Sequence, residues 1–309
     1  MKCFVVFLTL LIVIVWLGSS MVVAQQVNFW QQLDSSFLNV QDFLFYPNGD
    51  IFAACGDGSE IAIPFRGILR SSDNGQTWTN MFAQNVRKLA LNQKNGDLYA
   101  ATFHRLFRSS DSGITWIELV TPPGVRDRDG RPWWPIVDMV IDSSGHLFLG
   151  VLKNRIGARI YTSIDNGNTW LDDFKVYAIR SLSDMLFHPD GKVYLGTNRG
   201  IHYSLRKSSG DKTVFRSLSR PGFRHPRDCF ALGVNSKGDI FALVQGNRLI
   251  RYQYAVRKFQ QIPLPISLSF PTGGRHWYVL HIDPNDNIYV QMVEGEEFKI
   301  YRTADFGVT

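Results

Sequence analysis

The chain has 309 residues, with 33 basic and 27 acidic side chains and a formal net charge of +6. Apolar residues make up 45% of the chain and charged residues 19%, a globular composition that excludes a disordered chain, a collagen-like chain and a coiled coil. With only 3 cysteines, it is not a small domain held together by disulfides either.

The first 24 residues are typical of a secretory signal peptide. Lys2 precedes an uninterrupted apolar run over residues 4–17, and Val22 and Ala24 place small side chains before Gln25. The apolar run is shorter than the about 20 residues that a membrane-spanning helix needs. We therefore expect cleavage after residue 24 and a secreted or periplasmic mature chain, residues 25–309, with no stable membrane span. An uncleaved anchor is the alternative.

A hairpin pattern recurs six times along the rest of the chain. Each copy has a few apolar residues, a turn, and then an alternating apolar strand. The turn centres are Gly49, Gly96, Gly145, Gly191, Gly238 and Asp286, about 47 residues apart. Apolar runs on either side of Asn-Gly or Asp-Gly predict a β-hairpin.

A second strand pair recurs between the hairpins. Its last strand begins with an aromatic residue, at Trp30, Trp78, Trp116, Trp170, Phe215 and Phe259. Each unit is therefore four short strands, and no helical apolar period of useful length occurs after residue 27. Four-stranded units at this spacing predict an all-β fold, a β-propeller, in which the sheets pack face to face around an axis and keep only short edges.

The turn before three of these aromatic residues has the sequence S-x-D-x-G-x-T-W. The copies comprise Ser71, Asp73, Gly75 and Trp78; Ser109, Asp111, Gly113 and Trp116; and Ser163, Asp165, Gly167 and Trp170, with a partial copy at Asp305 and Gly307. The motif resembles the Asp-box, or BNR repeat, of sialidase-like, sortilin-like and photosystem II assembly factor-like propellers. The resemblance implies a structural turn on the face opposite an active site. Its Asp can accept backbone N–H groups, its Gly supplies an unusual backbone conformation, and its Trp packs between sheets. We expect no metal there.

The last partial copy stops at Thr309, before its expected Trp. In one interpretation, strand 28–33 supplies the missing outer strand, pairs with residues 298–302, and closes a six-bladed ring. In the other, which we slightly favour, the chain is a piece of a longer protein. Six blades is then a minimum, and a longer parent could have seven or eight.

The loops between units are the least repetitive parts of the sequence, at residues 120–135, 219–228 and 264–277. In propellers these loops share a face on which function is usually located. They hold the candidate ligand-binding residues Arg131, Trp133, Trp134, Arg227, Arg275 and Trp277. Arginine pairs with carboxylate or phosphate, and aromatic faces stack on sugars or cations. The loops predict either a pocket for an anionic or glycan ligand, or a solvated basic rim.

Three aspartates, Asp42, Asp138 and Asp184, stand at equivalent positions at the start of the innermost strand of their units. Lys88, Ala231 and Val279 stand there in the others. Carboxylates at this position would line the mouth of the central channel, where they could act as acid or base or bind a cation. Three copies of one residue favour a repeated hydrogen-bonding role.

Two functions follow, and we favour the first. The first is a non-enzymatic binding or scaffold propeller, a monomer without cofactor that presents a basic, aromatic loop face to a glycan or protein partner. Nucleic acid is not expected, because the charge density is low for an exported chain. The alternative is a glycoside hydrolase, sialidase-like or xyloglucanase-like. The Arg-Ile-Pro motif that the resemblance implies for sialidases is absent, because residues 63–66 read Ile-Pro-Phe-Arg.

Overall fold

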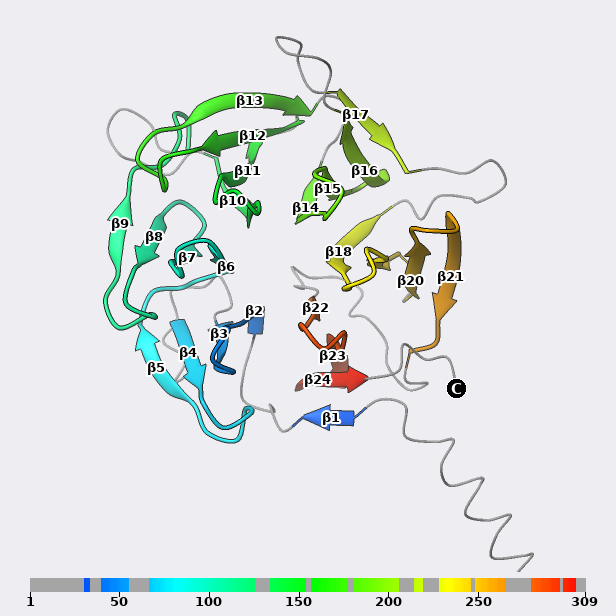
Figure 1. Ribbon diagram of the computed structural model, residues 1–309, viewed down its shortest axis with the longest axis horizontal. Coiled ribbons are helices and arrows are strands. Elements are labelled where there is room, and N and C mark those ends of the chain that lie inside the picture. Colours follow the sequence, from blue (N-terminus) through cyan, green and yellow to red (C-terminus); the bar gives the residue numbers. More distant parts are fainter. Residues whose placement is uncertain are drawn as a thin grey trace, which may run out of the picture.

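The computed structural model describes residues 31–33, 40–55, 67–125, 134–153, 157–176, 181–205, 214–218, 228–245, 248–264, 279–294 and 297–303. These residues form a six-bladed β-propeller, a ring of six antiparallel four-stranded sheets around a central axis (Figure 1). The described part of the chain contains no helix, and so no helix that could span a membrane. The propeller predicted from the repeats is confirmed.

Each of the first five blades uses four consecutive strands, from the innermost to the outermost. Blade 1 holds β2 (Val40–Phe45), β3 (Ile51–Cys55), β4 (Gly67–Ser71) and β5 (Thr79–Phe82). Blade 2 holds β6 (Lys88–Leu91), β7 (Leu98–Ala101), β8 (Leu106–Ser109) and β9 (Ile117–Leu119). Blade 3 holds β10 (Ile136–Ile141), β11 (Leu147–Lys153), β12 (Gly157–Ser163) and β13 (Leu171–Val176). Blade 4 holds β14 (Leu182–Phe187), β15 (Val193–Thr197), β16 (Gly200–Leu205) and β17 (Val214–Ser217). Blade 5 holds β18 (Cys229–Val234), β19 (Ile240–Val244), β20 (Arg248–Gln253) and β21 (Lys258–Ile262).

The sixth blade joins the two ends of the described chain. It holds β22 (Leu280–Ile282), β23 (Ile288–Glu294) and β24 (Glu297–Thr303), and its outermost strand is β1 (Gln31–Leu33). Gln31 lies opposite Arg302 and Leu33 opposite Ile300. This is the pairing that the first of the two interpretations of the N-terminal strand predicts. Figure 1 shows β1 on the outside of β24, closing the ring.

The hydrophobic core is divided into six clusters, one at each junction between neighbouring blades. Phe52 of blade 1 packs with Leu98 of blade 2, and Phe241 of blade 5 packs with Ile288 of blade 6. The cluster that joins blades 6 and 1 contains Val279 and Val40. Apolar burial of this kind is the main stabilising contribution to folding. No blade buries its faces alone, so the six are held as one ring.

The turns of the first hairpins show why glycine recurs there. Gly49 has a φ of 93° and Gly96 a φ of 80°, a region that side-chain-bearing residues rarely adopt. In blade 6 Asp286 takes the position with a φ of 64°, which Asp tolerates better than most residues. The carboxylate of Asp286 accepts hydrogen bonds from the backbone N–H and hydroxyl of Ser236 at 2.7 and 2.6 Å. At this strained position, the Asp286 side chain therefore joins blade 6 to blade 5.

The three S-x-D-x-G-x-T-W turns have the same hydrogen bonds. In blade 2, Ser109 Oγ donates to Asp111 Oδ1 at 2.7 Å, and the Gly113 N–H donates to Ser109 Oγ at 2.9 Å. The backbone N–H and hydroxyl of Thr115 both donate to the Asp111 carboxylate. These bonds, led by that from the Thr115 hydroxyl, lower the pKa of Asp111 to about 2. Blades 1 and 3 repeat this arrangement at Ser71, Asp73 and Gly75 and at Ser163, Asp165 and Gly167. Asp305 and Gly307 lie outside the described residues.

The tryptophan that ends each turn has a different hydrogen-bond acceptor in blade 3. The Trp78 and Trp116 indole N–H groups donate to the carbonyl of their own turn glycine, at 3.1 and 3.0 Å. The Trp170 indole instead donates at 2.8 Å to the carbonyl of Val120, just beyond β9 of the previous blade. The turn of blade 3 is therefore tied directly to the outer rim of blade 2.

Candidate functional site

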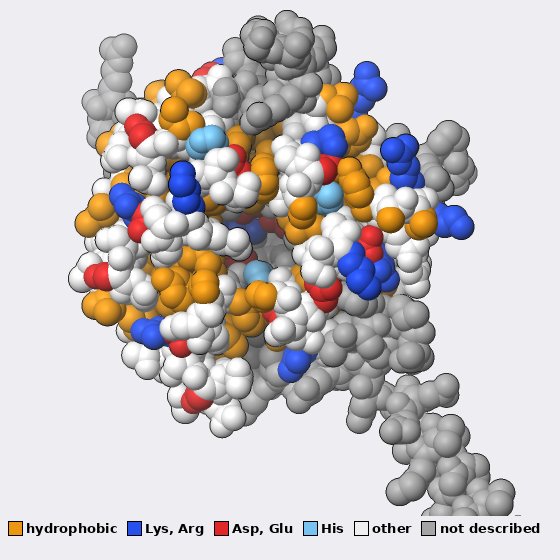
Figure 2. Space-filling model, in the orientation of Figure 1, with side chains coloured by type: hydrophobic (Ala, Val, Ile, Leu, Met, Phe, Trp, Pro, Cys, Tyr) orange, Lys and Arg blue, Asp and Glu red, His pale blue; other side chains and the backbone are white. Residues whose placement is uncertain are grey.

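A cavity of about 520 Å³ lies on the axis of the ring, between the innermost strands. Its lining runs from the starts of these strands, including Asp42 and Lys88, to the hairpin-turn residues Asp283 and Asp286. Figure 2 shows one face of the molecule hollowed at the centre of the ring, with basic and acidic side chains at depth. The cavity therefore has charged groups at its inner end and hairpin turns at its rim.

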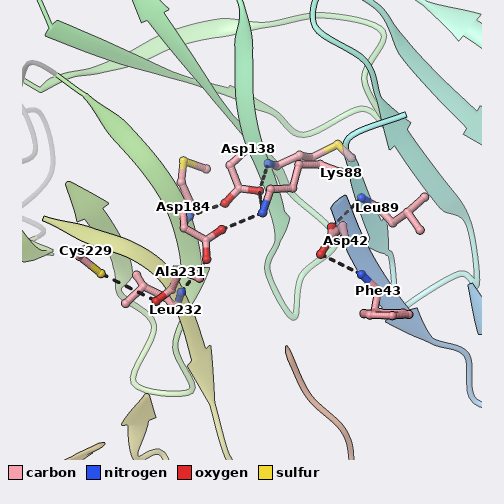
Figure 3. Close-up of polar contacts among 11 residues, drawn as sticks. Asp42, Phe43, Lys88, Leu89, Asp138, Asp184, Cys229, Ala231 and Leu232 are labelled. Carbon is pink, nitrogen blue, oxygen red and sulfur yellow. Dashed lines mark hydrogen bonds and ion pairs between the residues drawn. The ribbon is translucent and has the colours of Figure 1, made fainter. Parts of the chain in front are cut away.

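Four charged residues at that inner end form the axial cluster: Asp42, Lys88, Asp138 and Asp184. The Lys88 ammonium lies 2.9 Å from Asp184 Oδ1 and 3.3 Å from Asp138 Oδ1. In Figure 3 the Lys88 side chain extends toward these two carboxylates, while Asp42 faces the backbone of Phe43 and Leu89. One ammonium from blade 2 therefore binds carboxylates from blades 3 and 4.

Each aspartate of the axial cluster also accepts a hydrogen bond from the next blade. Asp42 Oδ2 accepts from the Leu89 N–H at 2.9 Å, and Asp184 Oδ2 accepts from the Leu232 N–H at 2.6 Å. Asp138 Oδ2 accepts from the Met185 N–H. The equivalent positions of the three aspartates in the sequence thus correspond to one repeated contact, which joins the innermost strands of neighbouring blades.

Burial sets the ionisation of this cluster. Loss of hydration raises the pKa of Asp42 from 3.8 to about 6, although Lys88 acts in the opposite direction. Burial likewise raises the pKa of Asp138 well above its ordinary value. For Lys88, burial alone would lower the pKa, but attraction to Asp138, Asp184 and Asp42 holds it well above the ordinary value. The cluster thus combines a charged ammonium with carboxyls that take up protons more readily than usual.

His281 forms part of the cavity wall near this cluster. Burial lowers its pKa to about 4, so the imidazole is neutral near pH 7. Its ring lies 4.9 Å from that of Phe45, centroid to centroid. Within the part of the chain that the structure describes, no group of three or more His, Cys, Asp or Glu side chains is placed to hold a metal ion.

A second group of side chains lies on the loop face, the face opposite the hairpin turns. Because consecutive strands are antiparallel, the loops between blades and those between second and third strands share this face. The basic–aromatic cluster consists of Trp134 from the loop between blades 2 and 3, Lys153 at the end of β11, and Arg159 near the start of β12. Lys153 Nζ lies 4.6 Å and Arg159 Cζ 5.8 Å from the centroid of the Trp134 ring. Two cations therefore lie within cation–π distance of one indole.

The Trp134 ring packs against Gly124 so closely that no side chain fits there. Gly124 has a φ of 93°, and a Cβ added there would lie 2.2 Å from the Trp134 ring. Trp134 also packs against the core cluster between blades 2 and 3, while part of its surface stays accessible. The indole thus packs against both Gly124 and the core.

Of the loop residues predicted from the sequence, the structure describes only Trp134; Arg131, Trp133, Arg227, Arg275 and Trp277 lie outside the described residues. Another loop-face arginine, Arg87, is 7% exposed and stacks on Phe103 at 4.0 Å, which makes it a packing residue. Lys153 and Arg159 were not predicted as binding residues, because they lie in strands β11 and β12 and not in the loops between blades. The signal that could have found them is their position on either side of the connection between the second and third strands of blade 3.

The comparisons show similarity in fold. No protein-family model matches the chain, and no curated protein matches its sequence. A putative gluconolactonase structure has a TM-score of 0.61 at 15% identity, over 89% of this chain and 91% of that one. YCF48 bound to a D1 peptide has a TM-score of 0.57 at 17% identity, over 90% and 81%. AFV00434, an ancestral GH74 enzyme, has a TM-score of 0.54 at 15% identity, over 87% of this chain and 36% of that one. The chain thus shares its propeller fold with enzymes and with a peptide-binding protein.

Proposed function

We propose that this chain is an exported, non-enzymatic binding propeller that presents its loop face to a glycan or protein partner carrying anionic groups. The observation that carries the proposal is the basic–aromatic cluster. A partly accessible indole beside a lysine and an arginine offers a stacking surface and cationic hydrogen-bond donors, from the Lys153 ammonium and from the N–H groups of Arg159 that its ion pair with Asp172 leaves over. Sugars and acidic peptide side chains match this chemistry.

Other features support the same function. Residues 1–24 have the pattern of a secretory signal, which supports export. The three S-x-D-x-G-x-T-W turns support a place among Asp-box propellers, whose boxes lie opposite the functional face. The superposed YCF48 structure holds a D1 peptide, which supports a protein or peptide as the partner class.

The contacts that the cavity carboxylates make favour a binding function over a catalytic one. Asp138 and Asp184 are each bonded both to Lys88 and to the backbone of the next blade. Carboxylates with these contacts join neighbouring blades and so hold the ring together. Arg70 and Arg251 likewise each form an ion pair with an aspartate of their own blade.

The test is a panel of neutral, sulfated and uronic-acid glycans, glycosides, and acidic peptides. Purified residues 25–309 are incubated with the panel, and retained ligand and released product are measured by mass spectrometry. The Lys153→Gln/Arg159→Gln variant should retain an anionic ligand at least tenfold more weakly. Lys237→Gln, on a hairpin turn of the opposite face, is the matched control and should bind as the wild type does. Equal retention by all three proteins would contradict the proposal.

A glycoside hydrolase remains the second candidate because of Asp42. A carboxyl in a cavity with a pKa of about 6 stays partly protonated near neutral pH, as a general acid must. In that case the panel releases product, and Asp42→Asn abolishes the release while leaving retention on the loop face unchanged. Retention without product supports the binding propeller.

A further inference from the structure

An apolar strip lies on the outer rim of blades 2 and 3, far from the axial cavity. The rim belt consists of Ile114, Ile117, Val120, Ile164 and Leu171, whose side chains are 56–70% exposed. In the described part of the chain, only one other large aliphatic side chain, Val256 of blade 5, is exposed to this degree. Scattered exposed aliphatics are ordinary on protein surfaces, but a contiguous group marks an interaction surface.

The rim belt is continuous across the boundary between the two blades. The turn at Gly113 leads into β9, and Val120 follows β9 directly. The Trp170 indole, which precedes Leu171, donates to the Val120 carbonyl at 2.8 Å. A Cβ added to Gly167 would lie 2.7 Å from Leu119, so the turn of blade 3 packs onto the end of β9. Figure 1 shows β9 and β13 following one another along the outside of the ring.

The fold itself does not require these apolar residues. Blade 1 has the same turn with the same hydrogen bonds, yet Ser72 stands at the position of Ile164 and Gln76 at that of Ile114. Thr79 stands at the position shared by Ile117 and Leu171. Blade 1 is therefore an internal reference in which the same positions are polar. The aliphatic residues at these positions of blades 2 and 3 are therefore not needed to form the turn.

The backbone beside the rim belt also has strand edges that no described strand pairs with. β9 and β13 are the outermost strands of their sheets, so each has an edge that no strand of its own blade pairs with. Such an edge offers main-chain donors and acceptors to an added strand, and alternate side chains of that strand can contact apolar residues nearby.

The charges around the rim belt favour one kind of occupant. Asp111 and Asp165 flank it, and hydrogen bonds led by those from Thr115 and Thr169 lower the pKa of each to about 2, so both are ionised. Two copies of the chain meeting through this surface would bring these carboxylates together. A segment that carries Lys or Arg beside its aliphatic residues would complement them.

We propose that the rim belt is the docking surface for an extended segment of a partner protein, in which aliphatic residues alternate with lysine or arginine. The segment lies along the edge formed by β9 and β13, with its aliphatic side chains on the belt and its cations near Asp111 and Asp165. This surface is separate from the loop face and does not depend on the function proposed for it.

The test transfers the residues of blade 1 onto the rim belt. The variant Ile114→Gln/Ile117→Thr/Ile164→Ser/Leu171→Thr keeps every residue of the S-x-D-x-G-x-T-W turns. Its probe is a fluorescein-labelled peptide of alternating valine and lysine, with valine–glutamate and serine–lysine peptides of equal length as controls. The wild type should bind the valine–lysine peptide at least tenfold more tightly than either control peptide. The variant should lose this preference, and Val256→Thr should keep it.

Three results would overturn the proposal. The first is equal binding of the valine–lysine peptide by the wild type and by a variant with an unchanged thermal unfolding curve. The second is equal or tighter binding of the valine–glutamate peptide. The third is a wild type that sediments as a dimer while the variant sediments as a monomer, which would assign the rim belt to a second copy of the chain. If the fourfold variant unfolds, the Ile117→Thr and Leu171→Thr single variants replace it, with the same expected direction.

Discussion

The replacement Asp42→Asn should stabilise the protein at neutral pH and not at acidic pH. Burial raises the pKa of the folded-state carboxyl from 3.8 to about 6, so the folded protein holds this proton more tightly than the unfolded chain does. Asp42 therefore contributes most to the free energy of unfolding below pH 4, where it is protonated in both states. This contribution is lost as the pH rises through about 6. At about 1.4 kcal/mol per pKa unit, the ionised carboxylate costs up to about 3 kcal/mol at pH 7.5.

The gain from the replacement should be smaller than that limit, for two reasons. Asp42 lines a cavity, where water screens part of its charge. Its oxygens also accept from the Phe43 and Leu89 N–H groups, and an asparagine can satisfy one of these two. We therefore expect Asp42→Asn to raise the free energy of unfolding by about 1–2 kcal/mol at pH 7.5, and to leave it equal or slightly lower at pH 4.

Urea unfolding of both proteins, followed by tryptophan fluorescence at pH 4, 5, 6 and 7.5, measures this difference. Asp97→Asn is the control, because it removes the partner of Arg108 and should destabilise the protein at neutral pH. A difference between Asp42→Asn and the wild type that does not change with pH would refute the reasoning, as would a less stable variant at pH 7.5.

Three further replacements test the axial cluster, the turns and the loop face. Lys88→Met leaves two buried carboxylates without their ammonium and should cost about 3–5 kcal/mol in urea unfolding at pH 7.5, with partial recovery at pH 5; a loss that is the same at both pH values would count against it. Ser109→Ala removes the hydroxyl that bonds Asp111 and should cost about 1–2 kcal/mol in the same assay, whereas Ser110→Ala should cost almost nothing. Gly124→Ala places a Cβ against Trp134 in a strained backbone and should lower the melting temperature and shift the tryptophan emission; unchanged values of both would show that the ring is free to move.

Local patterns were enough to predict the blades. The turn glycines repeat at a regular spacing, and apolar alternation on either side of them predicts the hairpins, so the architecture followed from short-range signals. Asp286 was placed in the same series although it is not glycine, and its positive φ agrees with that placement. The S-x-D-x-G-x-T-W turns are equally local, because each of their hydrogen bonds within Ser-Asp-Gly-Thr spans at most four residues.

Contacts across the ring could not be predicted in this way. The sequence places Lys88 and Asp184 at equivalent positions of two units, but only ring closure brings the ammonium of blade 2 within 2.9 Å of the carboxylate of blade 4. Trp170 ends the same S-x-D-x-G-x-T-W motif as Trp116, yet its indole bonds to the neighbouring blade instead of its own turn. The rim belt depends on that same junction, since its two halves are about 50 residues apart in the chain.

The sequence by itself determined the all-β class, the repeating four-stranded unit and the turn chemistry, because these depend on residues close together in the chain. It left open whether strand 28–33 or a longer chain completes the last unit. Only the tertiary structure decided that β1 pairs with β24, that one lysine serves two aspartates on the axis, and that Trp134 meets Lys153 and Arg159. These contacts depend on the radius of the ring and on how neighbouring blades pack, which are properties of all six sheets together.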